Sequence, residues 1–215
     1  MSRMRIDHVC YAAGPEGMKA TALRLADLLQ VNACQGGVHP RFGTRNMVLP
    51  LADGRYLEVV EVLDHPASDK APFGQAVRAR SAQGGGWMAW VVAVDDLSDV
   101  EERLGRQAVP GNRHTPEGVE LTWHQIGIKS LIEDPQLPFF VHWDSMEHHP
   151  SKLGSNGAKL VGLNIAGDPV AIRQWLGVTD VACSFESDID VEFDRSEAHA
   201  LESVVFATAG GTVTI

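Results

Sequence analysis

The sequence predicts an α+β fold in which a βαβββ unit, a strand followed by a helix and three more strands, occurs three times along the chain. Three apolar segments, residues 6–15, 88–97 and 160–169, each have the pattern of a short strand, a tight turn and the start of a helix. Each is followed about fifty residues later by a second strand-like segment that closes the unit. The repeated order and the regular spacing are the observations that predict this architecture.

The first unit is expected over residues 1–65. Its helix is expected to start at Pro15, because a proline at the first helical position loses no intrahelical hydrogen bond. Strands are predicted at residues 45–51 and 56–62, where β-rich stretches are broken by Gly and Pro. The helix carries one apolar stripe that faces a sheet, formed by Met18, Ala22, Leu25 and Leu29.

The second unit is expected over residues 86–145 and the third over residues 157–215. Asp96 and Asp168 are suited to cap their helices, since a carboxylate accepts hydrogen bonds from the first backbone N–H groups. The remaining strands of these units are predicted at residues 119–126, 139–143 and 212–215.

The units are separated by connectors rich in Gly and Pro, residues 64–86 and 145–157. The first connector is expected to contain a short helix near residues 75–80. We predict that the third unit packs beside the first two or pairs with its copy in a homodimer, since an uncovered sheet edge favours association.

The spacing between first and last strands predicts which residues are equivalent in the first two units. His8 and Glu58 are 50 residues apart, and Trp90 and His142 are 52 residues apart. This register aligns His8 with Trp90 and Glu58 with His142. Side chains alternate along a strand, so residues on first and last strands of paired units can point into one concave face.

Composition excludes several classes of function. The formal net charge is −10 and there is no basic stripe, which argues against binding to nucleic acid or to an anionic membrane surface. No apolar run approaches the ~18 residues that cross a bilayer. The cysteines, Cys10, Cys34 and Cys183, lack CxxC spacing and suit the reduced thiols of the cytoplasm. We therefore expect a cytoplasmic protein that binds neither nucleic acid nor a membrane surface.

Several blocks of residues resemble one known superfamily. They are Ile6-Asp7-His8-Val9, the stretch Gly37-Val38-His39-Pro40-Arg41-Phe42-Gly43-Thr44-Arg45-Asn46, Tyr56-Leu57-Glu58, Leu137-Pro138-Phe139-Phe140 and His149-Pro150. In order and over nearly the whole chain, they resemble the glyoxalase-like branch of the vicinal oxygen chelate (VOC) superfamily. The stretch from Gly37 to Asn46 is the most specific of them.

The resemblance implies that two βαβββ units pair around a cleft, with the third unit as an addition. Metal-dependent members of the superfamily hold a divalent ion there, with ligands from the first and last strands of each unit. The ion chelates adjacent oxygens of the substrate and stabilises an enediolate or a related anion. Other members keep the cleft, lack a metal and sequester a small molecule.

The predicted metal ligands are His8, Glu58 and His142. Imidazole and carboxylate together suit Fe(II), and similar donors serve Zn, Mn, Ni or Co. The set departs from the superfamily pattern because indole cannot ligate at Trp90 and because His142 stands where a carboxylate is usual. The alternative is a metal-free site in which His8 and Glu58 are hydrogen-bonded within the sheet and Trp90 is a stacking wall for the ligand.

The stretch after Gly36 predicts further site residues. His39 can act as acid or base near neutral pH, and Arg41 or Arg45 can hold an anionic group of the substrate. We therefore predict Glu58 and His39 as catalytic residues and Arg41, Arg45, Asn46 and Trp90 as substrate-binding residues; the alternative for the stretch is a turn with solvated polar side chains.

Three functions remain open from the sequence. The first is a metal-assisted isomerase, lyase or dioxygenase acting on a small oxygenated metabolite. The second is a metal-free protein that binds or sequesters a small molecule. The third is an interaction protein in which the cleft has no catalytic role.

Overall fold

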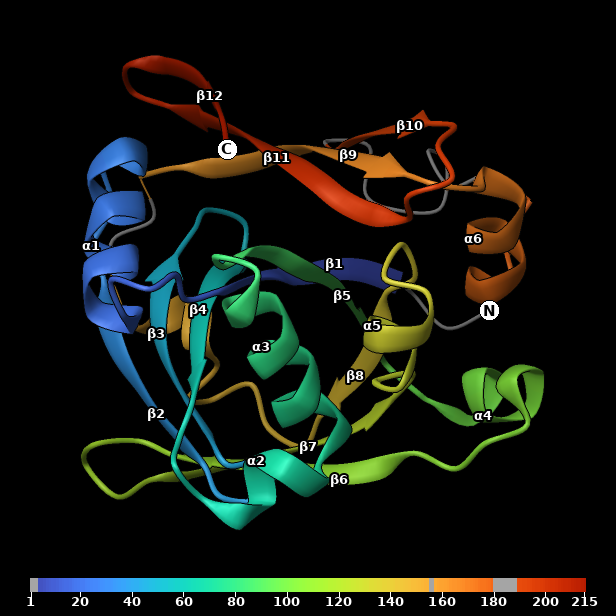
Figure 1. The fold of residues 1–215 in the computed structure, drawn as a ribbon, viewed down its shortest axis with the longest axis horizontal. Helices are drawn as coiled ribbons and strands as arrows, with labels where there is room; N and C mark the ends of the chain where they lie inside the picture. Colours follow the sequence, from blue (N-terminus) through green and yellow to red (C-terminus); the bar gives the residue numbers. More distant parts are fainter. Residues whose placement is uncertain (1–3, 155–156, 180–188) are drawn as a thin grey trace.

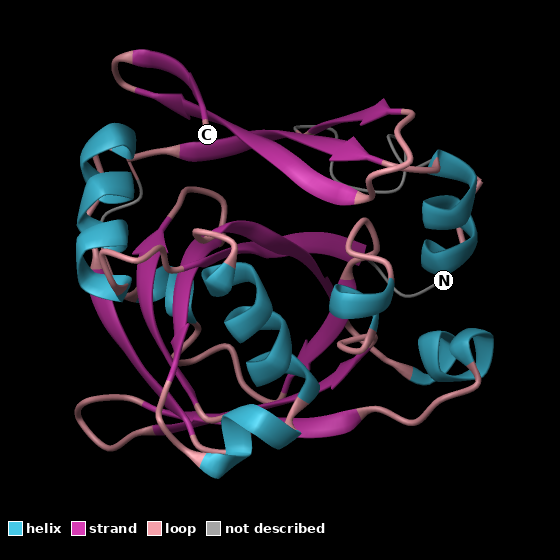
Figure 2. Cartoon of the chain, viewed as in Figure 1, coloured by secondary structure: helices cyan, strands magenta, loops and turns pink. Residues whose placement is uncertain are grey.

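The computed structural model describes residues 4–154, 157–179 and 189–215, which form two sheets and the helices around them (Figures 1 and 2). In this part of the chain, eight strands close into a barrel in the order β1-β4-β3-β2-β6-β7-β8-β5. A second, four-stranded sheet has the order β10-β9-β11-β12 and lies above the barrel in Figure 1. No helix in the described residues is long and apolar enough to cross a membrane.

The elements of the chain follow the predicted βαβββ order. The first unit comprises β1 (Met4–Ala12), α1 (Met18–Leu29), β2 (Cys34–His39), β3 (Thr44–Pro50) and β4 (Tyr56–Val62). The second comprises β5 (Gly86–Val94), α4 (Ser98–Leu104), β6 (Val109–His114), β7 (Glu120–Ile126), α5 (Ser130–Glu133) and β8 (Phe139–Trp143). The third comprises β9 (Lys159–Ala166), α6 (Pro169–Leu176), β10 (Asp190–Asp194), β11 (Ala200–Thr208) and β12 (Gly211–Thr214). The connectors carry α2 (Pro66–Lys70), α3 (Pro72–Ala82) and the 3₁₀ helix η1 (Pro150–Lys152). The predicted α+β fold with repeated βαβββ units is confirmed.

Two helices differ from their predicted bounds. The first helix begins at Met18 instead of Pro15, because the chain makes a turn at Pro15 and Glu16 and Gly17 adopts a φ of 85° before the helix. The connector helix α3 covers eleven residues, longer than predicted, and in Figure 1 it lies in front of the barrel opening.

The two halves of the barrel are related by approximate twofold symmetry. In the first half, β1 pairs in parallel with β4, and His8 lies opposite Tyr56. In the second half, β5 pairs in parallel with β8, and Val91 lies opposite Phe139. The halves join where β1 and β5 pair antiparallel, with His8 opposite Val91, and again where β2 meets β6.

The third unit shares the element order but not the strand order of the other two. Its first strand, β9, pairs in parallel with β10 and antiparallel with β11, so the last strand, β12, is at the edge. In the barrel units the first strand pairs with the last strand instead. The third unit is therefore a βαβββ segment with its own sheet topology.

The second sheet packs on the outer face of the β1–β5 seam. Trp90 and Val92 of β5 share one hydrophobic cluster with Leu163, Val204 and Phe206 of the second sheet. Burial of this apolar area, at roughly 25 cal/mol per Å², stabilises the contact between barrel and sheet. Of the two arrangements predicted for the third unit, packing beside the first two is the one observed, and a homodimer remains a prediction.

Candidate functional site

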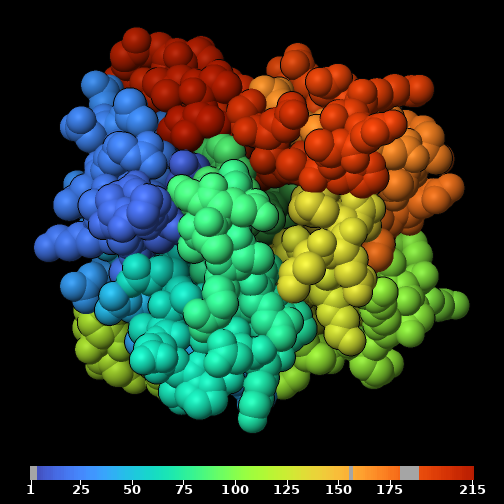
Figure 3. Space-filling model, in the orientation of Figure 1, coloured from blue at the N-terminus to red at the C-terminus, as the bar shows by residue number. Residues whose placement is uncertain are grey.

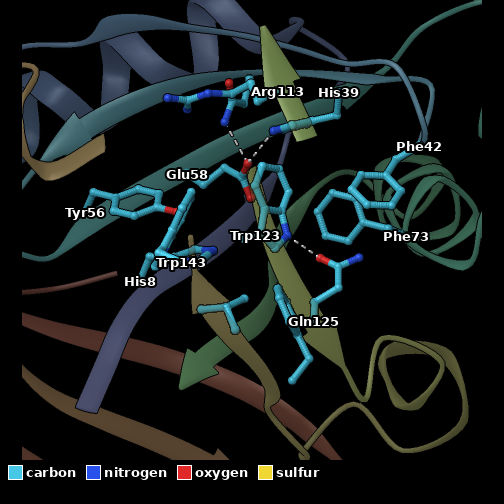
Figure 4. A pocket seen from close by; sticks show the side chains of 13 residues that line it. His8, His39, Phe42, Tyr56, Glu58, Phe73, Arg113, Trp123, Gln125 and Trp143 are labelled. Carbon is cyan, nitrogen blue, oxygen red and sulfur yellow. Dashed lines mark hydrogen bonds and ion pairs between the residues drawn. The ribbon is translucent and has the colours of Figure 1, made fainter. Parts of the chain in front are cut away.

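The inner chamber is a cavity of about 30 Å³ inside the barrel, on the opposite side of the sheet from the second-sheet contact. A volume of this size holds only one or two water molecules. Figure 4 shows the side chains that converge on it. The chamber is lined by His8, His39, Phe42, Asn46, Tyr56, Glu58, Phe73, Arg113, Trp123, Gln125, Phe139, Val141 and Trp143.

Glu58 of β4 provides the buried carboxyl group of the inner chamber. Its Oε1 accepts a hydrogen bond from Asn46 Nδ2 at 2.7 Å, and its Oε2 accepts one from Cys10 Sγ at 3.2 Å. Burial by itself raises the pKa of Glu58, but the imidazoles of His39 and His8 and the two hydrogen bonds outweigh it, so this pKa lies below its usual value. The buried carboxyl is therefore ionised at neutral pH.

His39 of β2 stands beside Glu58 among aromatic rings. Its Nε2 lies 3.7 Å from Glu58 Oε1, and its Nδ1 lies 3.0 Å from Thr44 Oγ1. The rings of Phe42 and Trp123 have centroids 6.2 and 6.0 Å from the imidazole centroid. Burial lowers the pKa of His39 to about 4, so its imidazole is neutral at pH 7.

Acidification is expected to destabilise the protein through His39. The unfolded chain takes up this proton below pH 6.5, whereas the folded protein leaves the imidazole neutral down to about pH 4. Stability therefore falls as the pH falls through this window, by about 2–3 kcal/mol between pH 6.5 and pH 4.5. Urea unfolding at successive pH values measures the change. In the variant His39→Gln, the free energy of unfolding should depend less on pH across this window. An equal pH dependence in both proteins would contradict the prediction.

Arg113 of β6 is a buried cation at the wall of the inner chamber. The residue is only 2% exposed. Within the described part of the chain, neither its Nε nor its Nη2 has a hydrogen-bond partner. Burial lowers the pKa of Arg113, while its electrostatic interactions with Tyr56 and Glu58 act in the opposite direction. A guanidinium stays protonated in proteins, so these buried donors are available to an oxyanion of a ligand.

His8 of β1 is held by Asp7, its neighbour in the chain. The pairing of β1 with β5 shifts register between Ile6 and His8, and this bulge leaves Asp7 without a partner on β5. The Asp7 Oδ2 lies 3.0 Å from His8 Nδ1. The imidazole of His8 stacks on the ring of Tyr56 with centroids 4.3 Å apart.

Asp7 is itself fully buried in a network that the sequence did not indicate. It accepts a hydrogen bond from Trp143 Nε1 at 3.1 Å, pairs with Arg5 at 2.5 Å, and lies 3.3 Å from His149 Nε2. Burial raises the pKa of Asp7, but hydrogen bonds and charges from His149 and His8 outweigh it and hold the pKa far below its usual value. The ionised Asp7 is an acceptor, so the Nδ1 of His8 is the donor in this contact.

The structure brings together four of the residues predicted from the sequence: His8, His39, Asn46 and Glu58 all line the inner chamber. His142 and Trp90 do not. His142 Nδ1 lies 3.1 Å from the Val94 carbonyl oxygen. The neighbours of His142 in β8, Val141 and Trp143, line the chamber instead. Trp90 is fully buried in the core and donates to the Gln136 carbonyl oxygen.

Trp90 and His142 lie outside the chamber because the strand register predicted for the second half of the barrel differs from the observed one. The parallel pairs place His8 opposite Tyr56 and Val91 opposite Phe139, so the counterpart of His8 is Val91. The counterpart of Glu58 is then Val141. Each predicted position is off by one residue, and a shift of one residue moves a side chain to the other face of a strand.

The two arginines predicted to bind substrate lie outside the inner chamber. Arg45 is exposed on the outer face of β3 and forms an ion pair with Glu61. Arg41 lies in the β2–β3 turn and lines a separate groove with Phe42 and Phe73. Arg113, which the sequence analysis did not select, is the arginine that faces Glu58 and His39.

Replacing Trp90 by alanine is expected to destabilise the protein without changing ligand binding in the inner chamber. Loss of a fully buried indole at the contact between barrel and second sheet costs about 3–5 kcal/mol. Denaturant unfolding measures the loss. The exposed Leu28 of α1 provides the comparison, since Leu28→Ala should change stability by less than about 0.5 kcal/mol. A small change in the free energy of unfolding of Trp90→Ala, together with weaker ligand binding, would support the stacking role instead.

One group of side chains has the atoms to hold a metal ion. Ligand atoms of His8, Cys10 and Glu58 lie within 4.8 Å of one another, and all three residues are buried. Cys10 joins this group because it lies opposite Glu58 in the β1–β4 pair. The counterparts in the second half, Val91 and Val141, offer no donor. The donor set is thus one-sided, and among the described residues it is the group of three or more His, Cys, Asp or Glu that meets this distance.

Comparisons with known proteins bear on the family of the chain. A family model for a glyoxalase-like domain matches residues 6–179. A comparison with curated proteins found no match. The structure of a hypothetical protein from Staphylococcus aureus is similar over 96% of this chain and 92% of its own, with 13% identity and a TM-score of 0.71, which shows a shared fold.

Smaller structures are similar over about two thirds of the chain. A methylmalonyl-CoA epimerase from Streptomyces coelicolor, solved in complex with 2-nitronate-propionyl-CoA, covers 66% of this chain and 98% of its own, with 17% identity and a TM-score of 0.45. Methylmalonyl-CoA epimerase from Mycobacterium tuberculosis covers 65% and 86%, with 14% identity and a TM-score of 0.42.

Proposed function

Because this chain belongs to the glyoxalase-like domain family, we propose that it is an enzyme whose inner chamber moves a proton on a small anionic substrate. The reaction class is an isomerisation or a lyase reaction that passes through an enolate or a related anion. One observation carries the proposal. The ionised, buried Glu58 lines the same chamber as Arg113, a buried cation with two donors that lack partners in the described residues.

Glu58 is the group that takes the proton. Its two oxygens each accept one hydrogen bond, from Asn46 and Cys10, and a carboxylate has further lone pairs to offer. These two bonds orient the carboxylate. A substrate that displaces the remaining water makes Glu58 a stronger base, since burial is the largest influence on its pKa and acts to raise it.

Arg113 and His39 hold the charge that develops on the substrate. Arg113 pairs its free N–H groups with a carboxylate or an enolate oxygen, which a guanidinium binds well in a water-poor site. His39 is neutral and adds a hydrogen bond. His8, whose Nδ1 is held by Asp7, places its imidazole beside Glu58 as a second polar group of the site.

Solvent exchange provides the test of this function. Small 2-oxo acids such as pyruvate and 2-oxobutanoate carry a carboxylate for Arg113 and an acidic C–H group for Glu58. The protein is expected to speed the exchange of that hydrogen with D₂O, which proton NMR follows directly. If none of a panel of such carboxylates either binds or exchanges in the presence of the protein, the proposal is wrong.

A metal-assisted reaction is the second candidate, and the group of His8, Cys10 and Glu58 favours it. These residues would hold a divalent ion from one side, and the ion would supply a Lewis acid for substrate oxygens. Thiolate and imidazole favour zinc or iron over magnesium. Glu58 would then serve as a ligand, and Arg113 would still bind the substrate anion.

Metal analysis separates the two candidates. The Glu58 and Arg113 mechanism predicts that chelation leaves proton exchange unchanged and that Cys10→Ser retains it within about threefold. A metal-assisted enzyme would contain about one ion per chain, lose it in Cys10→Ser, and lose exchange activity with it. Elemental analysis by mass spectrometry, combined with the NMR exchange rate, gives both readouts on the same samples.

A further inference from the structure

An outer groove of about 810 Å³ lies directly outside the inner chamber. The two share three lining residues, Phe42, Phe73 and Gln125. The groove runs between the N-terminal end of α3, the start of β6 and the segment that leads into α5. α3 and α5 contact each other and lie side by side on the face shown in Figure 3.

The aromatic pair separates the two spaces. The rings of Phe42 and Phe73 meet edge to face with centroids 5.7 Å apart. Phe42 comes from the β2–β3 turn and Phe73 from the first turn of α3. The chamber itself has room for only one or two waters, and Phe42 and Phe73 form part of the boundary that it shares with the groove.

The charge of the outer groove is opposite to that of the chain. Arg41, Arg106 and Lys129 line it, and all three are exposed, against the single carboxylate of Glu133. The whole chain has a formal net charge of −10. A cationic cleft on an acidic protein concentrates anions, and its apolar residues, including Val109 and Ile126, suit a hydrocarbon segment.

We propose that the outer groove binds the anionic tail of an elongated substrate whose reactive head enters the inner chamber. The tail is a phosphate or carboxylate held between Arg41, Arg106 and Lys129, and an apolar spacer passes Phe42 and Phe73. This proposal rests on the proposed function, since it assigns the head to Glu58 and Arg113. It adds the substrate class: a small carbonyl compound carried on a linker that ends in an anion.

Hexyl phosphate is a suitable probe because it combines a phosphate with an apolar spacer and has no reactive head. Isothermal titration calorimetry is expected to show binding that weakens at least tenfold in the double variant Arg41→Glu, Lys129→Glu. The affinity should also fall as NaCl rises from 50 to 300 mM, since exposed ion pairs are screened by salt. Hexanol, which lacks the charge, should bind much more weakly than hexyl phosphate.

Lys19→Glu is the matched control. It changes the net charge in the same direction but lies on α1, away from the groove. Its affinity for hexyl phosphate should stay within twofold of the unaltered protein. If Lys19→Glu weakens binding as much as the double variant does, the attraction is non-specific and the proposal is overturned.

Arg113→Met locates the phosphate and separates this proposal from the proposed function. It should leave hexyl phosphate binding within threefold, because the phosphate stays in the outer groove. If it weakens binding as strongly as the double variant, the phosphate occupies the inner chamber and the groove proposal fails. If the unaltered protein does not exchange protons, the proposed function is wrong and so is the assignment of the reactive head to the inner chamber. The anion site in the outer groove is tested separately, by calorimetry with hexyl phosphate.

Discussion

Replacing Glu58 by glutamine is expected to slow proton exchange by at least about 10²-fold, the lower end of what a positioned general base contributes. Glutamine keeps the size of the side chain and can still accept from Asn46 Nδ2, whose hydrogen bond to Glu58 is 2.7 Å long. It cannot take a proton. The NMR rate of hydrogen exchange into 2-oxobutanoate measures the effect at saturating substrate.

The binding constant of the same substrate is the control for Glu58→Gln. Because Arg113 remains, the affinity for the carboxylate should change by less than about tenfold while the rate collapses. Glu61 of the same strand offers a matched comparison on the outer face of the barrel, where it pairs with Arg45. Glu61→Gln should leave the rate intact, and an equal loss in both variants would show that Glu58 has no special role.

The second large effect is expected from Arg113→Met, which should weaken binding of small carboxylates at least about 10²-fold. Arg113 is 2% exposed, so its charge acts with little screening by water. Methionine preserves much of the apolar volume and removes the charge. Calorimetric titration of pyruvate measures the affinity, and Arg113→Lys should recover only part of it, since an ammonium cannot form the paired hydrogen bonds of a guanidinium.

Titration of His39 gives a readout that is independent of binding. The charge of Arg113 is one of the influences that lower the pKa of His39, so Arg113→Met should raise that pKa above its value of about 4. Histidine NMR signals over a pH series report it. Arg45→Met, on the outer face of the barrel, should alter neither the pKa nor carboxylate binding. An effect of Arg45→Met equal to that of Arg113→Met would exclude the assignment of the anion site to Arg113.

The order of elements could be predicted from the sequence because each unit leaves a local signal. Apolar strands, the Asp168 N-cap of α6 and the stripe on the first helix depend on neighbouring residues alone. Asp96 lies one residue before the N-cap of α4, which is Leu97. The strand register depends on contacts between distant segments. His8 and Glu58 are 50 residues apart, and the similar spacing of 52 residues between Trp90 and His142 placed these two beside them. Pairing in the barrel selected Val91 and Val141 instead.

The site residues also differ in whether a local sequence pattern could predict them. His8, Asn46 and Glu58 belong to strands that the sequence predicted, whereas His39 ends β2, a strand that it did not predict; the structure brings all four to one chamber. Arg113 lies in a polar stretch of β6, where no local feature distinguishes a buried arginine from a solvated one. Its burial follows from closure of the barrel where β2 meets β6, at the pair of Val38 and His114. Only the tertiary structure can show such a contact.

The two barrel halves are related by approximate twofold symmetry but present different side chains to the chamber. The wall built by β1 and β4 carries the proton-transfer groups His8 and Glu58, whereas the adjoining wall of β5 and β8 presents hydrocarbon to the chamber through Phe139 and Val141. Shortening Val141 would therefore enlarge the space for a substrate side chain while leaving the acid and base in place. Substrate preference in this protein is thus open to redesign by changing volume on one wall, without retuning any ionisable group.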